Sequence, residues 1–550
     1  MTWQFTVVML ASLLFTPGHV LAYCEWNGWA KGKGVIPVRL LDHDANNTFA
    51  GLPAAAVSRL TARVVDNWNE NGMANIRLAY QGITSNAGTF TDGVVMVRET
   101  SDCAKCGAGV IACAVGNDPP GGGDRIDANV WFVYNPTNGP QHNWGFYPDS
   151  NTGVDDLQGV MMHELGHVLG LNHFGDCGRS DKGVMGGGGS QYSDMRYVAR
   201  DDIEGLVSLY GYLRGNVNFQ ESTDGLSWKV GSPPINNETI GPMSSVTTAA
   251  RNETSVWLAF LNEHLGHPRV KFRWGHNGGY TQPGDVLGLS GPIDSWDAPA
   301  AAKGYGTALV TYFESEELSN NNKHIGYSYT LDGGQAWQYG QVRRNDGSLG
   351  FTRRDGLTAA FDPRMDRFII AYLGDDNNQN SSNCHTGLAR CDEIRIFTVK
   401  RDGSSPRHTS LNIQSIDAPG IACLASTSDN CVVTWVSTTA NACLHYGHSH
   451  ILADGTFTLV NDISQCYYGY QTAFITVADT DPTYPFKLTL RQASNSVHTF
   501  QKSAFVTSSW RDPRTFGVLP FVISPSVGSF DFSSANSVHS ELNLFYVKGK

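Results

Sequence analysis

Residues 163–173 read HELGHVLGLNH, and the interpretation of the first half of the chain begins with them. His163 and His167 stand at i and i+4, so on a helix both imidazoles leave the same face about one turn apart and can share one metal ion. Gly170 follows three residues after the second histidine, where a residue that tolerates positive φ can end the helix and turn the chain back. His173 can then supply a third ligand.

Three neutral imidazoles leave the fourth position of a tetrahedral zinc ion open, which is typical of a catalytic rather than a structural site. Water would occupy that position, and zinc lowers the pKa of such a water from about 15.7 to roughly 7. Glu164, which follows His163, is the candidate base that accepts the proton as the water attacks a carbonyl carbon. The alternative is a buried helix with incidental histidines, which would need all five fixed positions to match by chance.

The stretch resembles the HExxHxxGxxH signature of the metzincin zinc metalloproteases, and it matches every fixed position. The resemblance implies an α+β metzincin-type catalytic domain that cleaves a protein or peptide substrate. It assigns zinc to His163, His167 and His173 and the catalytic base to Glu164. It also implies a methionine that packs beneath the metal, for which Met185 is the candidate.

The segments before the motif predict the elements that such a domain needs. An apolar stripe of Val57, Leu60, Val64 and Trp68 predicts a helix over 53–70. Strands are expected at 35–40, 76–80, 94–98 and 127–134. The zinc helix is expected to begin at Asp155, with Gln158 completing a capping box.

The end of this region resembles the matrixins among the metzincins. Asp201 and Glu204 predict a capping box for a last helix in ARDDIEGLVSLYG, residues 199–211. The segment 116–127 is glycine-rich and acidic, but it lacks the histidines with which matrixins bind structural zinc. Its carboxylates could bind calcium, and a solvated loop is the alternative; the candidate ligands are Asp118, Asp124 and Asp127.

Length and composition indicate a secreted protein with more than one domain. The chain has 550 residues, more than one ordinary core supports, and its net charge of -12 gives no support to a nucleic-acid partner. An apolar run at 5–15 with a small residue at Ala22 predicts a secretory signal at residues 1–22. The run is shorter than the roughly 20 residues that span a bilayer, so no membrane span is expected.

The eleven cysteines all follow that segment, and an extracellular location would let most of them pair. Cys103 and Cys106 form a CxxC without the second CxxC of a structural zinc site, so a disulfide is favoured there. Three further pairs are expected in the second half: Cys423 with Cys431, Cys384 with Cys391, and Cys443 with Cys466.

The second half reads as a six-fold repeat of short β-rich runs about 50 to 60 residues long. Six hydrophobic second strands begin near 256, 308, 368, 431, 486 and 542, but only five fourth strands follow. Residues 217–219 would supply the sixth and so close the ring with both ends of the region. We therefore expect a signal peptide at 1–22, a zinc protease domain at 23–212 and an all-β six-bladed propeller at 213–550.

Two turns of this region, at 330–337 and 222–228, resemble the Asp-box hairpins of sialidase-like propellers. In these turns Asp accepts amide hydrogen bonds and Gly permits positive φ, so their expected role is structural. A sialidase also needs an arginine cluster, for which Arg353, Arg354 and Arg364 are scattered candidates only. The propeller is therefore interpreted as a binding module.

Together these features favour a secreted zinc-dependent endopeptidase whose propeller binds the substrate or a surface. The alternative hypothesis is a glycan- or protein-binding propeller protein in which proteolysis is minor or highly selective. Aromatic side chains on the propeller loops would suit a glycan or glycoprotein partner, although core packing explains most of them equally well.

Overall fold

The computed structural model describes the following residues of the first part of the chain: 28–30, 33–42, 48–71, 74–89, 91–102, 106–107, 110–117, 124–134, 141–146, 153–173, 183–186 and 198–212. In the second part it describes 215–222, 229–230, 246–252, 255–264, 267–276, 279–280, 284–295, 299–304, 307–317, 322–332, 334–352, 356–374, 393–415, 418–424, 430–436, 444–460, 463–465, 470–477, 486–492, 497–502, 511–516, 526–528 and 542–549. None of the described helices has the length and apolar character needed to cross a membrane.

The first part is built on a five-stranded sheet in the order β4-β1-β5-β7-β6. Its strands are β1 (Val35–Leu41), β4 (Arg77–Thr84), β5 (Val95–Thr100), β6 (Ala112–Asn117) and β7 (Asp127–Val133). Four of them run parallel, while β6 pairs antiparallel with β7 at the edge. The four parallel strands confirm the predicted ones within a few residues, and β6 was not predicted.

Among the described residues three helices accompany this sheet: α1 (Ala54–Asn71), α2 (Leu157–Val168) and α3 (Arg200–Tyr210). The predicted stripe of α1 is buried from Val57 to Trp68, and α1 packs against β4 and α2. The indole Nε1–H of Trp68 donates to the carbonyl of Met162 in α2 at 3.0 Å, which fixes the zinc helix against its neighbour. Short strand pairs complete this part: β2 (Thr48–Phe49) with β3 (Leu52–Pro53), and β8 (Trp144–Gly145) with β9 (Asp155–Asp156).

Both predicted capping boxes are wrong in detail. The N-cap of α2 is Asp156, whose Oδ1 accepts the amide of Gln158, whereas Asp155 lies in β9 and its carboxylate contacts His142 Nδ1 at 3.1 Å. The helix therefore begins later than the prediction because the short β8–β9 pair holds the preceding residues extended.

The last helix begins earlier than its prediction. Its N-cap is Ala199, and the carboxylate of Asp202, three residues on, accepts the Ala199 amide at 2.8 Å. Asp201 is therefore already inside the first turn rather than at the cap. Glu204 pairs instead with Arg200 at 2.8 Å, one turn back on the same helix.

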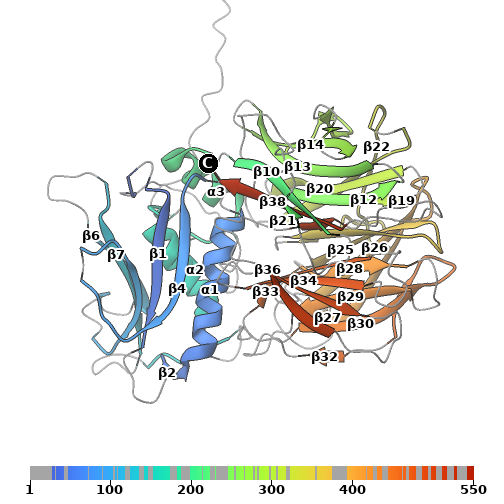
Figure 1. The fold of residues 1–550 in the computed structure, drawn as a ribbon. Helices are drawn as coiled ribbons and strands as arrows, with labels where there is room; N and C mark the ends of the chain where they lie inside the picture. Colours follow the sequence, from blue (N-terminus) through green and yellow to red (C-terminus); the bar gives the residue numbers. More distant parts are fainter. Residues whose placement is uncertain are drawn as a thin grey trace, which may run out of the picture.

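The second part is a ring of antiparallel sheets (Figure 1). The first sheet contains β12 (Val246–Asn252), β13 (Ser255–His264), β14 (His267–His276), β15 (Gly279–Tyr280) and β16 (Gly284–Asp285). The second contains β19 (Ala300–Gly304), β20 (Thr307–Glu317), β21 (Asn322–Thr330), β22 (Gln338–Gln341) and β23 (Phe351–Thr352). Between them β17 (Leu287–Gly288) pairs with β18 (Gly291–Pro292).

The third sheet contains β24 (Leu357–Asp362), β25 (Arg367–Gly374), β26 (Glu393–Lys400) and β27 (Arg407–Gln414). The fourth contains β28 (Gly420–Cys423), β29 (Cys431–Val436), β30 (Leu444–Ile451), β31 (Phe457–Leu459) and β32 (Ile463–Gln465). The fifth contains β33 (Tyr470–Val477), β34 (Phe486–Gln492), β35 (Val497–Lys502) and β36 (Arg511–Phe516). The sixth combines β37 (Ser526–Gly528) and β38 (Leu542–Gly549) with β10 (Gly215–Ser222) and β11 (Lys229–Val230).

The two ends of this region close the ring as the repeat predicted. Strand β10 pairs antiparallel with β38, placing Val217 opposite Val547 and Phe219 opposite Phe545. The innermost strands β12, β19, β24, β28, β33 and β37 contact one another in sequence, and β37 returns to β12. The described residues therefore form an all-β propeller region of six sheets.

The first Asp-box turn has the predicted structural role. The Asp332 carboxylate accepts the amides of Gln335 at 3.0 Å and Ala336 at 2.9 Å. Trp337 packs edge-on against Phe272 of the preceding sheet, with ring centroids 5.2 Å apart. In the second turn, residues 223–228 lie outside the described residues.

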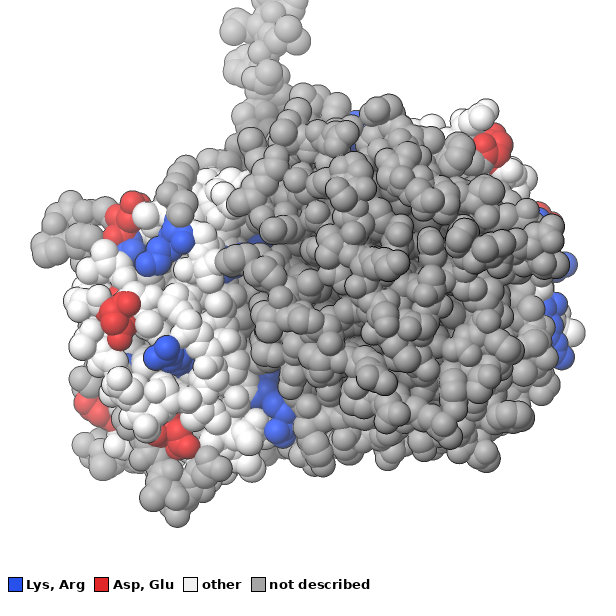
Figure 2. Space-filling view, viewed as in Figure 1, with Lys and Arg blue, Asp and Glu red and all other residues white. Residues whose placement is uncertain are grey.

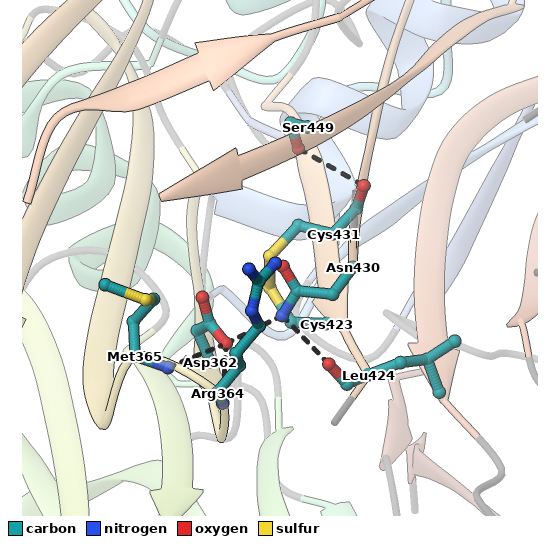
Figure 3. Close-up of a disulfide and its surroundings, with 8 residues drawn as sticks. All are labelled: Asp362, Arg364, Met365, Cys423, Leu424, Asn430, Cys431 and Ser449. Atoms are coloured by element: carbon teal, nitrogen blue, oxygen red, sulfur yellow. Dashed lines mark hydrogen bonds between the residues drawn. A yellow bond between two sulfur atoms is a disulfide. The ribbon is translucent and has the colours of Figure 1, made fainter. Parts of the chain in front are cut away.

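Two disulfides lie within the described residues. The Cys423–Cys431 pair joins neighbouring strands β28 and β29, which confirms that prediction (Figure 3). Cys106 pairs with Cys113 of β6 instead of with Cys103, because the turn before the edge strand brings their Cα atoms to 5.3 Å. The remaining predicted partners fall outside the described residues: Cys103, Cys384, Cys391, Cys443 and Cys466.

Charged side chains on the described surface of the first part are of both signs. In Figure 2, Lys and Arg residues are interspersed with Asp and Glu on this face. This mixed distribution differs from the single-sign basic face typical of nucleic-acid binding.

Candidate metal centre

Helix α2 and the turn after it bring the three predicted histidines together. His163 and His167 leave one face of α2 with ring centroids 4.7 Å apart. The Nε2 atom of His173 lies 3.0 Å from Nε2 of His163 and 3.1 Å from Nε2 of His167. Among the described residues this is the one group of three or more His, Cys, Asp or Glu side chains whose ligand atoms could hold a metal ion.

The turn at Gly170 explains how the third histidine reaches the site. Gly170 has φ of 98°, and its amide donates to the carbonyl of His167 at 3.0 Å. The amide of Leu171 donates to the carbonyl of Gly166, also at 3.0 Å. These two bonds form a Schellman motif, which ends the helix and directs the chain back toward His173.

Backbone carbonyls fix the tautomers of the two helix histidines. His163 Nδ1 lies 2.7 Å from the carbonyl of Val184, and His167 Nδ1 lies 2.8 Å from the carbonyl of Leu171. A carbonyl can only accept, so each Nδ1 carries the hydrogen and donates it. In the neutral ring each Nε2 then presents its lone pair to the shared point, as in histidines that bind metals.

Burial keeps these rings neutral. His163 is 7% and His167 6% exposed, and burial lowers the pKa of His163 to about 4 and of His167 to about 3. Neither Nε2 atom can then donate to the other nitrogens around it. Lone pairs that converge in this way repel one another unless a cation lies between them, and imidazole nitrogens suit zinc. The residues therefore fit a zinc ion.

Glu164 follows His163 on α2 and is buried. Its side chain is 5% exposed, and its carboxylate accepts the amide of Ala114 in β6. Its other acceptor, Oε2, has no hydrogen-bond partner among the described residues. Burial raises the pKa of Glu164 to about 8, so without a neighbouring cation the carboxyl group holds its proton at neutral pH.

Met185 has the predicted packing role. The side chain is fully buried, and its Sδ occupies the space where a Cβ on Gly166 would lie. Gly166 stands between the two helix histidines in the sequence, so the thioether packs against the helical turn that carries them. This contact supports the site through packing, as a thioether does in an apolar core.

Several residues that support the site were not predicted. Asp202 of α3 accepts the amides of Val184 at 3.0 Å and Met185 at 3.3 Å. Ala114 belongs to the missed edge strand, and Arg125 donates to carbonyls at the end of α2. All these contacts join residues distant in the sequence. The sequence pattern predicted a local cap at Asp201 and Glu204 and indicated no role for Asp202.

The acidic segment does not assemble a calcium site among the described residues. Asp127 is buried, and its carboxylate accepts the amides of Asp92, Gly93 and Ala128. These contacts satisfy it as an acceptor of backbone hydrogen bonds. Asp118 lies outside the described residues, so calcium has no structural support here. The sialidase candidates Arg353 and Arg354 also lie outside them.

Three solved structures illustrate the likeness that structural comparison finds for this chain. A mutant of the Aleuria aurantia lectin bound to Fucα1-6GlcNAc has 10% identity, covers 52% of this chain and 84% of its own, and has a TM-score of 0.33. A mutant of AofleA from Arthrobotrys oligospora has 9% identity, coverages of 61% and 84%, and a TM-score of 0.37. A Bacteroides ovatus glycosyl hydrolase has 13% identity, coverages of 54% and 78%, and a TM-score of 0.28. Likenesses of this size carry no information about what this chain binds.

A family model described as Matrixin, a peptidase family, matches residues 99–211. The match spans β6, β7, α2 and α3, and so includes all three histidines and Glu164. It supports a metallopeptidase activity for this part of the chain.

Proposed function

We propose that the protein is a secreted zinc-dependent endopeptidase in which His163, His167 and His173 hold the metal and Glu164 is the catalytic base. The observation that carries the proposal is the convergence of three Nε2 atoms, together with a buried glutamate next to His163 in the sequence whose Oε2 has no hydrogen-bond partner among the described residues. A structural zinc site would be closed by a fourth protein ligand, and no fourth ligand joins this group among the described residues.

A zinc ion held there would supply Lewis-acid chemistry, polarising the scissile carbonyl and acidifying a water. The cation would also favour the charged form of Glu164 and so oppose the effect of burial. Glu164 Oε2 can then take the proton from the attacking water and pass it to the leaving amine. The Ala114 amide fixes the carboxylate during both transfers.

The edge strand offers a place for an extended peptide. β6 ends the sheet order and pairs on one side only, with β7, among the described residues. Its Val115 is exposed, and the preceding residue, Ala114, contacts the catalytic glutamate. A substrate strand that adds to β6 would therefore run beside the metal centre.

Cleavage of an unfolded generic protein tests this function. The full mature chain is compared with Glu164→Ala, and bound zinc is quantified in both. We expect about one zinc per chain in each protein and cleavage by the parent alone. Glu204→Ala is the matched control, because Glu204 pairs with Arg200 on α3 and should leave cleavage unchanged. Equal cleavage by the Glu164→Ala protein would contradict the assigned role.

The propeller completes the proposal as the module that binds the substrate or a surface. Its six sheets close on themselves, so the ring can present loops as one rigid surface. The inactive Glu164→Ala chain permits the test, since it can bind without cutting. Selective retention of one glycan or glycoprotein class on an array would identify the ligand, whereas retention of none would restrict the partner to proteins or peptides.

A further inference from the structure

Arg125 lies where the C-terminal end of α2 meets the edge strand. Its side chain is 4% exposed, and its Nη1 donates to the carbonyl of His167 at 2.6 Å and to that of Val168 at 3.0 Å. Both carbonyls belong to the last turn of the zinc helix, where carbonyl groups lack partners within the helix. A cation at this end also interacts favourably with the helix dipole.

The guanidinium is held from its other side by β6. A Cβ built on Gly116 would lie 2.6 Å from Arg125 Nε and 2.8 Å from its Cζ, closer than real contacts allow. Only glycine therefore leaves room for Arg125 at this point. The same strand supplies the Ala114 amide that holds Glu164, so Arg125 bridges β6 and α2, the helix that carries both Glu164 and His167.

The N-terminal segment fixes the backbone of Arg125. The backbone amide of Arg125 donates to the carbonyl of Gly28 at 2.7 Å. The indole of Trp29, the residue after Gly28, donates to the carbonyl of Val168 at 2.9 Å. From α3, the hydroxyl of Tyr210 donates to the carbonyl of Leu169 at 2.7 Å. Three consecutive carbonyls at the end of α2 thus have side-chain donors from three distant segments.

We propose that Arg125 is a positioning residue for the metal centre, which it serves by fixing the last turn of α2, and with it His167, at a set distance from β6. The inference rests on the proposed function, because it assumes that His167 holds zinc. Arg125 touches neither the metal point nor the reacting atoms, so it acts only through His167 and the edge strand. His167 is also the histidine whose Nδ1 acceptor, the carbonyl of Leu171, follows directly after the clamped turn.

Zinc release provides a readout that does not depend on turnover. The zinc-loaded full chain is mixed with excess chelator, and the rate of metal loss is measured for the parent, Arg125→Met and Arg125→Lys. Loss of a residue that orients a metal ligand typically costs about 10- to 100-fold in metal affinity or activity. We expect release to accelerate about 10-fold or more in Arg125→Met and less in Arg125→Lys, which keeps the charge and a donor. With a peptide substrate, kcat should fall while KM changes little.

Gly116→Ala tests the same clamp without removing the arginine, because the added methyl group displaces the guanidinium. Arg77→Met is the matched control. Arg77 Nη1 likewise donates to two carbonyls, those of Ala74 and Ile76, but it lies at β4. This control should release zinc at the parental rate even if its unfolding temperature falls.

Parental release rates in folded Arg125→Met and Gly116→Ala proteins would overturn the proposal. So would a change no larger than that in Arg77→Met, since that result would indicate a general loss of stability. Failure of the Arg125 proposal can be distinguished from failure of the proposed function. A parent that holds one zinc but cleaves nothing, or a Glu164→Ala protein that still cleaves, contradicts the peptidase assignment, and release rates still decide the role of Arg125. A parent that binds no zinc overturns both proposals.

Discussion

Asp202 and His163 are linked through one intervening residue, Val184. The carboxylate of Asp202 accepts the amide of Val184 at 3.0 Å, and the carbonyl of Val184 accepts the Nδ1–H of His163 at 2.7 Å. The same carboxylate accepts the amides of Met185 and Ala199. Helix α3 thus fixes the segment that orients His163, the proposed metal ligand, and metal-binding histidines generally have outer support of this kind.

We expect Asp202→Asn to weaken this support and the fold together. The amide has one acceptor oxygen, and its NH2 group would face backbone N–H groups that are buried. Leaving such a group unsatisfied costs about 1–3 kcal/mol, so the free energy of unfolding should fall by about 2 kcal/mol or more. Denaturant unfolding with zinc quantification measures both effects, and Glu204→Gln on the same helix is the control. Unchanged zinc content and stability would contradict the role of Asp202.

Gly170→Ala should damage the turn that delivers His173. A Cβ on Gly170 would lie 2.9 Å from the Cα of Gly28, at a φ of 98° that side chains rarely adopt. Gly153→Ala is the matched control, since its φ is 65° but nothing lies within 4 Å of the added carbon. The control isolates backbone strain, of about 1–2 kcal/mol. The Gly170 variant should lose more stability than this and retain zinc poorly, and equal behaviour of the two variants would contradict the steric argument.

The stability of the metal-free protein should pass through a maximum as pH changes. Burial lowers the pKa of His163 to about 4 and of His167 to about 3, and it raises the pKa of Glu164 to about 8. Between pH ~4.5 and ~6.5 the two histidines bind protons only in the unfolded chain, whereas Glu164 binds one only in the folded chain. The unfolded chain therefore holds about one proton more in total, and the free energy of unfolding rises with pH. From pH ~6.5 to ~8 only the Glu164 difference remains, and stability falls.

Unfolding experiments in the presence of a chelator measure this profile. The maximum is expected near pH ~6.5, and Glu164→Gln should remove the decline on the alkaline side. The rise in stability with pH on the acid side of the maximum should persist in that variant, because it depends on the two histidines. A metal-free parent that continues to gain stability up to pH ~8 would contradict the raised pKa of Glu164.

The sequence predicted the parts of the site that depend on local spacing. His163, His167 and Glu164 share one helix, and Gly170 sets the following turn, so their arrangement follows from helix geometry. The supporting contacts of Asp202 and Arg125 join segments that are far apart in the chain, and no local pattern reports them. The same limit explains why the predicted caps of α2 and α3 were wrong by one and two residues.

In the fold, too, the features set by local sequence patterns were predicted, and those set by contacts between distant segments were not. The propeller was predictable because each repeat places a hydrophobic strand at a regular interval, and the missing fourth strand indicated the closure between β10 and β38. Strand β6 was missed because Ala112–Asn117 has neither β-branched enrichment nor clear alternation. It is held in place by pairing with β7 and by the Cys106–Cys113 disulfide.

A buried polar contact between two propeller sheets leads to the last prediction. The Nδ2 group of Asn430 donates to Asp362 Oδ1 at 2.7 Å and to the carbonyl of Leu424 at 2.8 Å, next to the Cys423–Cys431 disulfide (Figure 3). Asp362 ends β24 and Asn430 precedes β29, so the contact joins the third and fourth sheets. Both side chains are fully buried.

Asn430→Ala should therefore destabilise the propeller without changing zinc content. Burial raises the pKa of Asp362, and the Asn430 donor opposes that shift, so its loss should raise this pKa further. The charged carboxylate then becomes more costly in the folded state, and we expect a loss of about 2 kcal/mol that is larger at neutral pH than in acid. Ser449→Ala is the control, since its hydroxyl donates to the Cys431 carbonyl at 3.3 Å. A loss in Asn430→Ala that is independent of pH would show that packing, and not the Asp362 charge, dominates this contact.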